Sequence, residues 1–331
     1  MPADESSLTV AVTGPTGTFG HGLMPLLQEQ PSVTRVVGIA RRPFDPAAQG
    51  WTKMEYRRGD VRDEGALREA FAGADVVVHL AFLIVGGSAE TTRSINVEGT
   101  LNAFRAAAAA GAKRFVYASS VAAYGFHRDN PMGMTEDWPT RPADKLFYAQ
   151  EKAELEELLQ AESAQHPELE LYLLRPPVVL GPHTVGGKAP LPGPLAPLNK
   201  YLQSGIRRLP IPVPGFVPDI PLQFIHEDDV GRALVQCVIA AGPPGAYNIA
   251  GEGVLSLPEV AREFNVIPIP ISSRLTYAGA RLISRLPLPS FGEWVEAFSH
   301  PAIMDTTRAL EQLGWKPQFT GLEALRDTLK H

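Results

Sequence analysis

Cysteine is almost absent from this sequence of 331 residues. Its one cysteine, Cys237, excludes an internal disulfide and any metal site built from several thiolates. Cys237 stands in an apolar, helix-like stretch, which predicts a position in the core. The eight histidines show no His-x-x-x-His spacing, so we expect no metal site.

The sequence also lacks an excess of positive charge and any long hydrophobic run. Its net charge of −6 argues against a broad surface for nucleic acid. The longest apolar stretch, residues 76–85, contains a histidine and is far shorter than the roughly 20 residues that span a bilayer. Residues 1–9 are polar and acidic and do not resemble a secretory signal. We therefore expect a cytoplasmic protein that binds neither nucleic acid nor membrane.

The sequence does contain an alternation of apolar strands with helices. Strand-like runs that are apolar throughout, each followed by a helix, indicate a parallel sheet covered on both faces, which is an α/β fold. The predicted strands are residues 8–13, 35–40, 75–81, 114–119, 169–175 and 246–250. The predicted helices are residues 19–29, 64–71, 91–110, 145–165, 228–241, 256–264, 306–313 and 322–329.

Many prolines mark a change of character after Arg175. Residues 176–221 have few periodic segments and cannot belong to a central sheet, so they are interpreted as a functional insertion. The C-terminal part repeats this apolar, proline-marked style. Two domains are therefore predicted: residues 1–175 with 228–250 returning to them, and a smaller, discontinuous substrate domain of residues 176–227 and 251–331.

Three glycines directly follow the first predicted strand. In Gly14-Pro-Thr-Gly17-Thr-Phe-Gly20 the chain must turn sharply, and side chains at the glycines would keep backbone N–H groups away from a pyrophosphate. The helix that follows directs its positive end toward the phosphates. In this strand–turn–helix context the pattern predicts a doubly wound, Rossmann-type dinucleotide-binding domain, the alternative being a plain tight turn.

The spacing G-x-x-G-x-x-G resembles that of the extended short-chain dehydrogenase/reductase superfamily, the group that includes NAD-dependent epimerases and dehydratases. Further segments match the family's motifs in the family's order along most of the chain. They are Gly59-Asp60-Val61-Arg62-Asp63, His79-Leu80-Ala81, Asn96-Val97-Glu98-Gly99-Thr100, Tyr247-Asn248-Ile249 and Leu313-Gly314-Trp315-Lys316-Pro317. Besides the three glycines, the resemblance implies a cofactor site of Thr16, Thr18, Phe19, Asp60, Val61, Leu80, Ala81, Asn96 and Pro176, with Asp60 near the adenine.

The end of the second predicted strand indicates which nicotinamide cofactor is bound. An acidic residue there would accept hydrogen bonds from the ribose 2′-hydroxyl and repel a 2′-phosphate. This strand is followed by Arg41 and Arg42 and no carboxylate, so two guanidinium groups stand where a phosphate is expected. We predict NADP(H) over NAD(H), with NAD remaining possible if both arginines are solvated surface charges.

Tyr148 and Lys152 stand four residues apart, which places both on one face of a predicted helix. A free tyrosine ionises near pH 10, and a neighbouring ammonium favours the phenolate that proton transfer at neutral pH requires. The pair follows the segment Ala118-Ser119-Ser120-Val-Ala-Ala-Tyr124-Gly125, which resembles the family's serine segment. The resemblance implies that Ser120 orients the reacting oxygen, with Ser119 the neighbouring candidate, and that Lys152 also holds the nicotinamide ribose.

The substrate half departs from the nucleotide-sugar enzymes of this family. Val178 replaces an asparagine after the sixth strand, and Leu222 replaces an arginine that contacts substrate phosphate. A buried diphosphate needs cationic partners, which this chain offers only elsewhere, at Lys188, Lys200, Arg207 and Arg208. The apolar residues of the insertion and of Leu286–Phe291 either line a pocket for an apolar or aromatic substrate or merely pack the small domain.

Five other polar residues are considered for a functional or a structural role. His226 is a candidate general acid, although its place in the family is that of a helix-entry residue. Asp228 and Asp229 are expected to cap the following helix. Glu136 and Asp137 either orient the substrate or are solvated loop charges.

The resulting prediction is an NAD(P)-dependent oxidoreductase that reduces a carbonyl, or oxidises an alcohol, on an apolar or aromatic small molecule. One alternative is a nucleotide-sugar epimerase or dehydratase, and another is a cofactor-sensing protein without turnover. Family resemblance also predicts a homodimer through the helices at residues 91–110 and 145–165, where the alanines Ala106–Ala110 would permit close approach.

Overall fold

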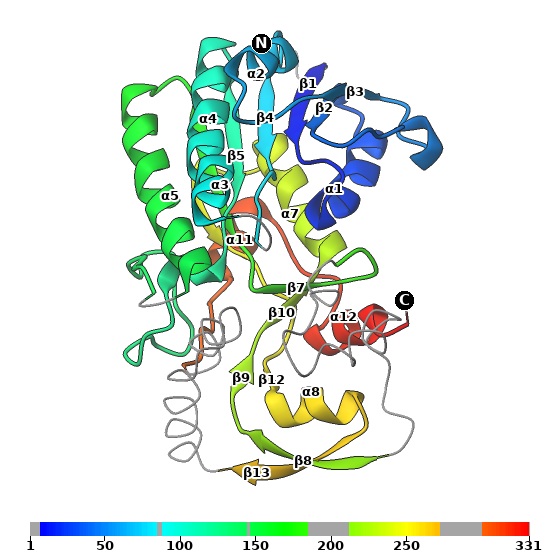
Figure 1. The fold of residues 1–331 in the computed structure, drawn as a ribbon, viewed down its shortest axis with the longest axis vertical. Helices are drawn as coiled ribbons and strands as arrows, with labels where there is room; N and C mark the ends of the chain where they lie inside the picture. Colours follow the sequence, from blue (N-terminus) through cyan, green and yellow to red (C-terminus); the bar gives the residue numbers. More distant parts are fainter. Residues whose placement is uncertain (1–6, 85–87, 144–145, 185–211, 272–299, 331) are drawn as a thin grey trace.

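The computed structural model describes residues 7–84, 88–143, 146–184, 212–271 and 300–330 (Figure 1). The four cationic residues proposed above as alternative phosphate contacts, and the apolar stretch Leu286–Phe291, lie outside the described residues.

The described part of the chain contains a central parallel sheet, as predicted, and this sheet has seven strands instead of the six expected. Their order across the sheet is β11-β6-β5-β4-β1-β2-β3. The strands are β1 (Leu8–Thr13), β2 (Val33–Ala40), β3 (Met54–Arg58), β4 (Val76–His79), β5 (Arg114–Ala118), β6 (Glu170–Arg175) and β11 (Gly245–Asn248). The order reverses between β1 and β4, and in open parallel sheets such a switch point opens a crevice at the carboxyl ends of the strands.

Helices cover both faces of this sheet, because alternate residues of the strands are apolar on each side (Figure 1). In β1, Val10 and Val12 join one core cluster and Ala11 joins the other. On the first face lie α1 (Thr18–Glu29), α7 (Glu227–Val238) and α11 (Thr307–Leu313). On the second face lie α2 (Glu64–Phe71), α4 (Gly99–Ala109) and α5 (Phe147–Gln165), with α3 (Ala89–Arg93) preceding α4.

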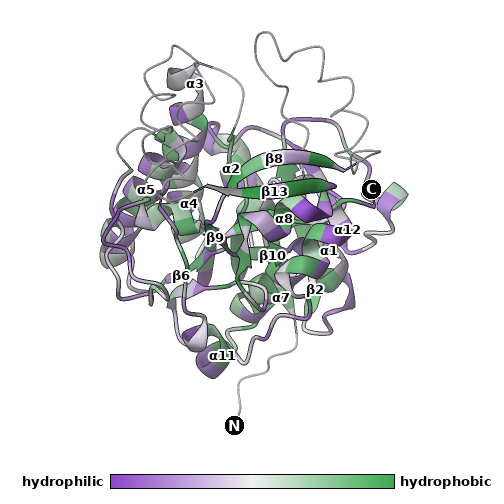
Figure 2. Cartoon of the chain, turned by 90° about the horizontal axis from the view of Figure 1, so that it is seen from below, coloured by the Kyte–Doolittle hydropathy of each residue, from purple (hydrophilic) through white to green (hydrophobic). Residues whose placement is uncertain are grey.

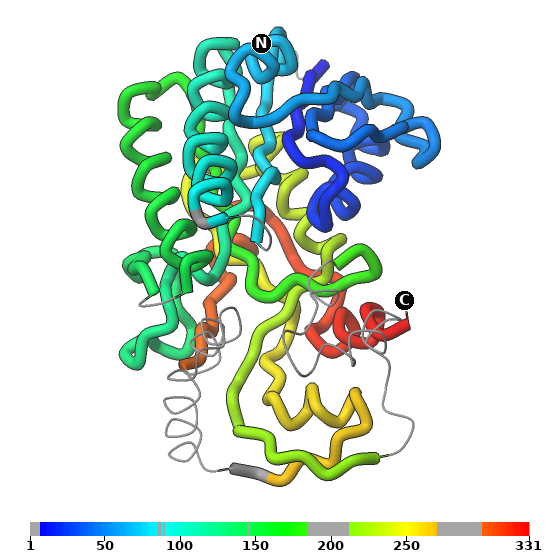
Figure 3. Tube along the Cα trace, in the orientation of Figure 1, coloured from blue at the N-terminus to red at the C-terminus, as the bar shows by residue number. Residues whose placement is uncertain are grey.

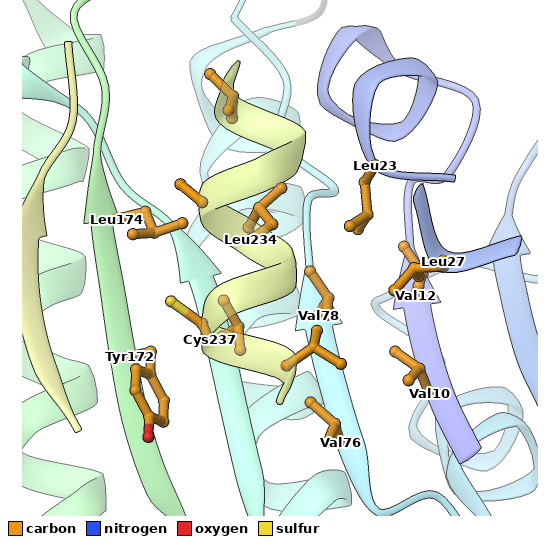
Figure 4. Close-up of a cluster of buried hydrophobic side chains, with 14 of the residues drawn as sticks. Val10, Val12, Leu23, Leu27, Val76, Val78, Tyr172, Leu174, Leu234 and Cys237 are labelled. Carbon is orange, nitrogen blue, oxygen red and sulfur yellow. The ribbon is translucent and has the colours of Figure 1, made fainter. Parts of the chain in front are cut away.

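Helix α7 fills the middle of the first face (Figure 4). Leu234 and Cys237 point from it toward valines of β1 and β4 and toward Leu174 of β6. Cys237 is completely buried and free, which confirms its predicted place in the core, and burial raises the pKa of its thiol.

Two glycines allow α1 and α7 to cross in close contact. A Cβ atom at Gly22 would lie 2.2 Å from the carbonyl oxygen of Glu227, and one at Gly231 would lie 2.1 Å from the carbonyl oxygen of Gly22. Only a residue without a side chain fits at such distances. The crossing brings the start of α7 next to the glycine loop that precedes α1.

A smaller unit follows β6 and lies beyond the carboxyl ends of the central strands (Figure 1). It contains the pairs β7 (Val178–Leu180) with β10 (Phe224–His226), β9 (Pro221–Leu222) with β12 (Leu255–Ser256), and β8 (Val213–Pro218) with β13 (Val266–Ile271). Helices α8 (Leu257–Glu263) and α12 (Gly321–Thr328) lie in the described residues of this unit. The tube in Figure 3 shows the chain leaving the large unit, returning through α7 and β11, and leaving it again. The division into two domains stays a prediction, and α11, which lies within the range given to the substrate domain, packs on the central sheet.

The outer strands of the small unit carry exposed apolar side chains. Phe216 of β8 and Ile267 of β13 are among the most exposed large apolar residues of the described chain. Hydrophobic colours run along β8 and β13 in Figure 2. Beneath them, Phe224, Leu325 and neighbouring residues form a separate small core.

Some elements differ from those expected from the sequence. Strand β3 is not in the prediction, because its sequence Met-Glu-Tyr-Arg-Arg is mostly polar and the strand lies at the sheet edge. The long helix expected over residues 91–110 is α3, a π-helical turn at Ser94–Glu98 and α4 in succession. The capping box expected at Ser256 is present at the start of α8.

Candidate functional site

The glycine loop has the geometry that close approach of a pyrophosphate requires. Gly14 has φ of +69°, and a Cβ atom there would lie 3.0 Å from the backbone of Ala81. A Cβ atom at Gly20 would lie 2.0 Å from the carbonyl oxygen of Pro15. Gly17 is the N-cap of α1, and no side chain caps the N–H groups of the first turn, so these groups are available to an anion. The residues present therefore fit a dinucleotide phosphate.

Beside this loop, a buried polar chain fixes the carboxyl ends of β1 and β4. Thr13 Oγ1 accepts from the backbone N–H groups of Leu80 and Ala81 at 3.2 Å and lies 2.9 Å from Nδ1 of His79. The other ring nitrogen of His79 lies 3.0 Å from Oγ1 of Thr100. Burial lowers the pKa of His79 to about 3, so the ring is neutral at pH 7.

Asn96, in the π-helical turn, fixes the segment after β4. Its Oδ1 accepts from Leu83 N at 2.7 Å, and its Nδ2 donates to Leu83 O at 2.9 Å and to Glu151 of α5 at 2.8 Å. Asn96 is fully buried. It is therefore a support for the residues predicted to line the cofactor, and its contacts in the structure are with protein groups.

The turn after β2, where the adenosine is expected, carries two arginines and no carboxylate. Arg41 and Arg42 are exposed. The hydroxyl of Tyr56 in β3 donates to the carbonyl oxygens of Ala40, at 3.1 Å, and of Arg42. Arg58 donates to the carbonyl of Arg41 at 3.1 Å. The neighbouring strand thus holds this turn, and Arg58 is a third cation that the sequence analysis missed.

The predicted adenine contact at Asp60 already has a partner. Arg62 donates to both oxygens of the Asp60 carboxylate, at 3.0 and 2.7 Å, and this contact lowers the pKa of Asp60. Val61 is buried and packs against Gly99 at the start of α4. Pro176 is also buried, and its carbonyl accepts from Val121 N at 2.9 Å, which connects the end of β6 to the serine segment.

The structure brings the predicted serine and tyrosine together. Tyr148 lies in the first turn of α5, and Ser120 is the N-cap of the 3₁₀ turn Val121–Tyr124 that follows β5. The two side chains are hydrogen-bonded to each other. Burial raises the pKa of Tyr148, and the hydrogen bond with Ser120 opposes this rise. The sequence predicts a lowered pKa from Lys152 together with the positive charge of a bound nicotinamide, whereas burial within the protein alone raises it.

Lys152 lies one turn further along α5 and is buried. Its Nζ atom donates to the hydroxyl of Tyr117 at 2.9 Å and to the carbonyl of Ala118 at 2.8 Å, both in β5. It lies 5.9 Å from the ring centroid of Tyr148 and 3.8 Å from that of Phe82. Burial lowers the pKa of Lys152 to about 7. Neither Tyr117 nor Phe82 belongs to a motif used above.

Ser119, the neighbouring candidate, is turned away from Tyr148 into a buried ionic network. Its hydroxyl donates to Glu156 of α5 at 2.5 Å. Glu156 pairs with Arg175 at the end of β6, and Arg175 donates to the hydroxyl of Tyr124 at 2.6 Å. This network connects α5, β5 and β6 beneath the site, so Ser119 has a structural partner and Ser120 is the serine that faces Tyr148.

The carboxylates considered as substrate contacts have structural partners instead. Glu136 is buried, where it accepts from Asn248 N at 2.8 Å, so it is not a solvated loop charge. Burial raises the pKa of Glu136. Asp137 is exposed and pairs with Arg308 at 2.7 Å.

The expectation that Asp228 and Asp229 cap α7 is wrong. His226 is the N-cap, and its Nδ1 accepts from Asp228 N at 3.2 Å. Asp229 is fully buried and instead accepts from the backbone N–H groups of Gln318 and Phe319. His226 is buried, with Nε2 3.3 Å from Asp327 and its ring stacked on Phe319. It is a helix-entry residue, as its family position indicated.

The two departures from the nucleotide-sugar pattern have different surroundings. Val178 is 51% exposed, at the start of β7. Leu222 packs into the small core around Phe224 and Leu325. Neither residue offers a charge to a phosphate.

Two further observations concern the described residues alone. No helix among them is long and apolar enough to cross a bilayer. Of the alanines predicted to pair with a second copy, Ala106 and Ala107 are buried within their own chain, so this part of the predicted face is not available.

Comparison with known proteins identifies what this arrangement is similar to. The profile of the NAD-dependent epimerase/dehydratase family matches residues 10–250. An uncharacterised protein of Mycobacterium tuberculosis is 27% identical over 325 residues, which cover 96% of this chain and 82% of that protein. UDP-glucose 4-epimerase 2 of Oryza sativa subsp. japonica is 28% identical over 354 residues, which cover 96% of this chain and 80% of that protein.

The fold is also that of solved structures. MoeE5 in complex with UDP-glucuronic acid and NAD superimposes with a TM-score of 0.70 at 24% identity, covering 97% of this chain and 98% of that chain. At this identity the likeness concerns the fold.

Proposed function

The chain belongs to the NAD-dependent epimerase/dehydratase family, and from this premise we propose that it is an NAD(P)-dependent oxidoreductase that reduces a carbonyl or oxidises the corresponding alcohol. The observation that carries the proposal is the convergence of Ser120, Tyr148 and Lys152 beside the switch point between β1 and β4. A bound nicotinamide supplies or accepts the hydride.

Each of the three residues has one task in this proposal. Tyr148 gives the proton to the substrate oxygen, or takes it in the reverse direction. Ser120 hydrogen-bonds the same oxygen and so directs it toward Tyr148. Lys152 holds the nicotinamide ribose with its ammonium. The glycine loop at Gly14–Gly20 binds the pyrophosphate through backbone N–H groups.

We further propose that NADP(H) is preferred. The support is the pair of exposed arginines, Arg41 and Arg42, in a turn held by Tyr56 and Arg58, together with the lack of a carboxylate at the end of β2. A 2′-phosphate gains charge-assisted hydrogen bonds from guanidinium groups. Solved structures of similar fold contain NAD, so both cofactors belong in the test.

The proposed substrate has an apolar or aromatic body. The support is that Val178 and Leu222 replace two polar residues that nucleotide-sugar enzymes of this family use, and that Leu222 is part of an apolar cluster. An apolar wall favours a substrate without a diphosphate, since a desolvated diphosphate requires cationic partners.

The experiment is a turnover screen of carbonyls, alcohols and nucleotide sugars with both cofactors, followed by Tyr148→Phe on the best substrate. We expect kcat to fall about 100-fold or more, because proton transfer is lost, while the cofactor Kd is unchanged. Tyr172→Phe is the control, because it removes a hydroxyl that donates to the carbonyl of Gly242. Wild-type kcat in Tyr148→Phe would contradict the proposal.

A nucleotide-sugar epimerase or dehydratase is the second candidate. It is favoured by the rice UDP-glucose 4-epimerase among the relatives and by the nucleotide sugar in the MoeE5 complex. Stoichiometric consumption of NADPH or NADH at 340 nm would support the oxidoreductase. Conversion of a nucleotide sugar without net change in the cofactor would support the second candidate. Cofactor binding without turnover of any substrate would instead indicate a cofactor-sensing protein.

A further inference from the structure

The ammonium of Lys152 is held by protein groups other than Tyr148 and Ser120. Two of its three N–H groups have oxygen acceptors in β5, the hydroxyl of Tyr117 and the carbonyl of Ala118. A third contact is with the ring of Phe82, whose centroid lies 3.8 Å from Nζ. The position of the ammonium is therefore fixed by three groups that do not belong to the serine, tyrosine and lysine set.

Tyr117 is the unusual acceptor among them. It is almost fully buried in β5, and burial raises the pKa of its phenol well above the ordinary value, so the hydroxyl stays protonated. A neutral phenol oxygen accepts a hydrogen bond from an ammonium without bringing a charge into the core. The ring of Tyr117 also lies near Nζ, at 4.6 Å from its centroid.

Phe82 connects the two proposed catalytic side chains. Its ring packs edge-on against the ring of Tyr148, with centroids 5.6 Å apart and planes at 87°. The same ring lies over the ammonium of Lys152. The side chain of Asn96 bonds both the N–H and the carbonyl of the neighbouring Leu83. The segment that carries Phe82 is therefore fixed to the π-helical turn that carries Asn96. The aromatic face attracts the cation and keeps water from it.

We propose that Tyr117 and Phe82 are positioning residues that hold the charged form of Lys152 at the end of β5, ready for the nicotinamide ribose. This inference rests on the proposed function, since it assigns to Lys152 a task in binding the cofactor. Tyr117 acts on the cofactor through Lys152, and so does Phe82, which in addition contacts the ring of Tyr148 directly.

Several other charged or titratable groups face Lys152. Their effects have to be separated from those of Tyr117 and Phe82 on the pKa of Lys152. Glu151 and Glu156 on α5 favour its charged form, whereas burial opposes it, and the result is a pKa of about 7. His79 in β4 is neutral and brings no charge. Tyr148 lies on the same helix. Because a hydrogen-bond acceptor and an aromatic face both favour the ammonium, removing either lowers the pKa of Lys152 further.

The test is the pH dependence of cofactor binding, measured by fluorescence titration of the full chain with NADPH and with NADH. Affinity should fall as pH rises through the pKa of Lys152, because the neutral amine holds the cofactor less well. In Tyr117→Phe and in Phe82→Leu we expect this fall at lower pH, by about half a pH unit or more. Tyr172→Phe, which removes a buried hydroxyl from the adjacent strand β6, should keep the wild-type profile.

The outcomes separate this inference from the proposed function. Wild-type profiles in Phe82→Leu, or in a Tyr117→Phe protein that still binds cofactor, would overturn the inference and leave the proposed function standing. If Tyr117→Phe does not fold, Phe82→Leu decides, since Phe82 is a partly exposed loop residue. A wild-type chain that binds neither cofactor at any pH would overturn both.

Discussion

Two residues directly after β2 decide which cofactor is preferred in our proposal. Arg41 and Arg42 are expected to bind a 2′-phosphate. We predict that the double substitution Arg41→Ala/Arg42→Ala weakens NADPH binding by about 10- to 100-fold, since charge-assisted hydrogen bonds are lost, and leaves NADH binding unchanged. The control is Arg35→Ala, at the opposite end of the same strand, where Arg35 pairs with Glu55. An equal loss of NADH and NADPH affinity in the double variant would contradict the assignment.

A second prediction at this scale concerns His79, which is buried and neutral. In the unfolded chain a histidine takes up a proton near pH 6.5, whereas in the folded chain it does so only near pH 3. The unfolded state thus binds more protons between these values, so stability falls as pH falls through this window, by up to about 1.4 kcal/mol per pH unit. His79→Gln should have a shallower pH dependence in urea unfolding from pH 7 to 4. Parallel curves for the two proteins would refute this.

The site residues that were predicted from the sequence lie in short local motifs, whereas those that were missed do not. Ser120, Tyr148 and Lys152 belong to local patterns, a serine segment and a four-residue helical spacing, which a sequence displays directly. Tyr117 and Phe82 contact Lys152 from other elements, so only the packing of β5, α5 and the segment after β4 brings them together.

At the scale of elements, the crossing of α1 with α7 fixes the approach to the glycine loop. Gly22→Ala would place a Cβ atom 2.2 Å from a backbone oxygen of α7, so the helices must move apart. We predict a loss of about 1–3 kcal/mol in the free energy of unfolding, and weaker cofactor binding.

The matched control is Gly65→Ala in α2, where a Cβ atom would meet only a carboxylate oxygen of Asp63 at 3.2 Å. This variant should be as stable as the wild type or more stable, by up to about 1 kcal/mol, because alanine favours a helix. Equal stabilities of the two variants in urea unfolding would show that the crossing tolerates a side chain.

Elements were predicted well where their sequence pattern is strong. The apolar strands that form the centre of the sheet, and helices such as α2, stand near their expected positions. Strands β3, β7 and β8 were missed. Edge strand β3 is mostly polar, β7 has only three residues, and β8 contains two prolines, so none of them shows such a pattern. The π-helical turn that carries Asn96 has no sequence signature either.

At the scale of the whole molecule, the dimer stays a prediction. The buried Ala106 and Ala107 remove part of the expected contact, and the exposed sides of α4 and α5 carry ion pairs such as Arg105 with Glu162. Family resemblance still leads us to expect twice the chain mass of 35.8 kDa in light scattering at working concentration. A monomeric mass across the accessible concentration range would refute this expectation.

The sequence alone predicted the parallel sheet and the glycine loop, because hydrophobic periodicity and glycine spacing are properties of neighbouring residues. Its resemblance in several motifs indicated the family. Tyr148 and Lys152 were proposed from their helical spacing, whereas Ser120 followed from the resemblance to the family's serine segment. The tertiary structure decided which polar side chains are buried and which partners they have. Asp229 accepts from Gln318 and Phe319 instead of capping α7, Glu136 is buried instead of solvated, and Lys152 donates to Tyr117. These outcomes depend on contacts between residues distant in sequence, where desolvation forces each buried polar group to find a partner.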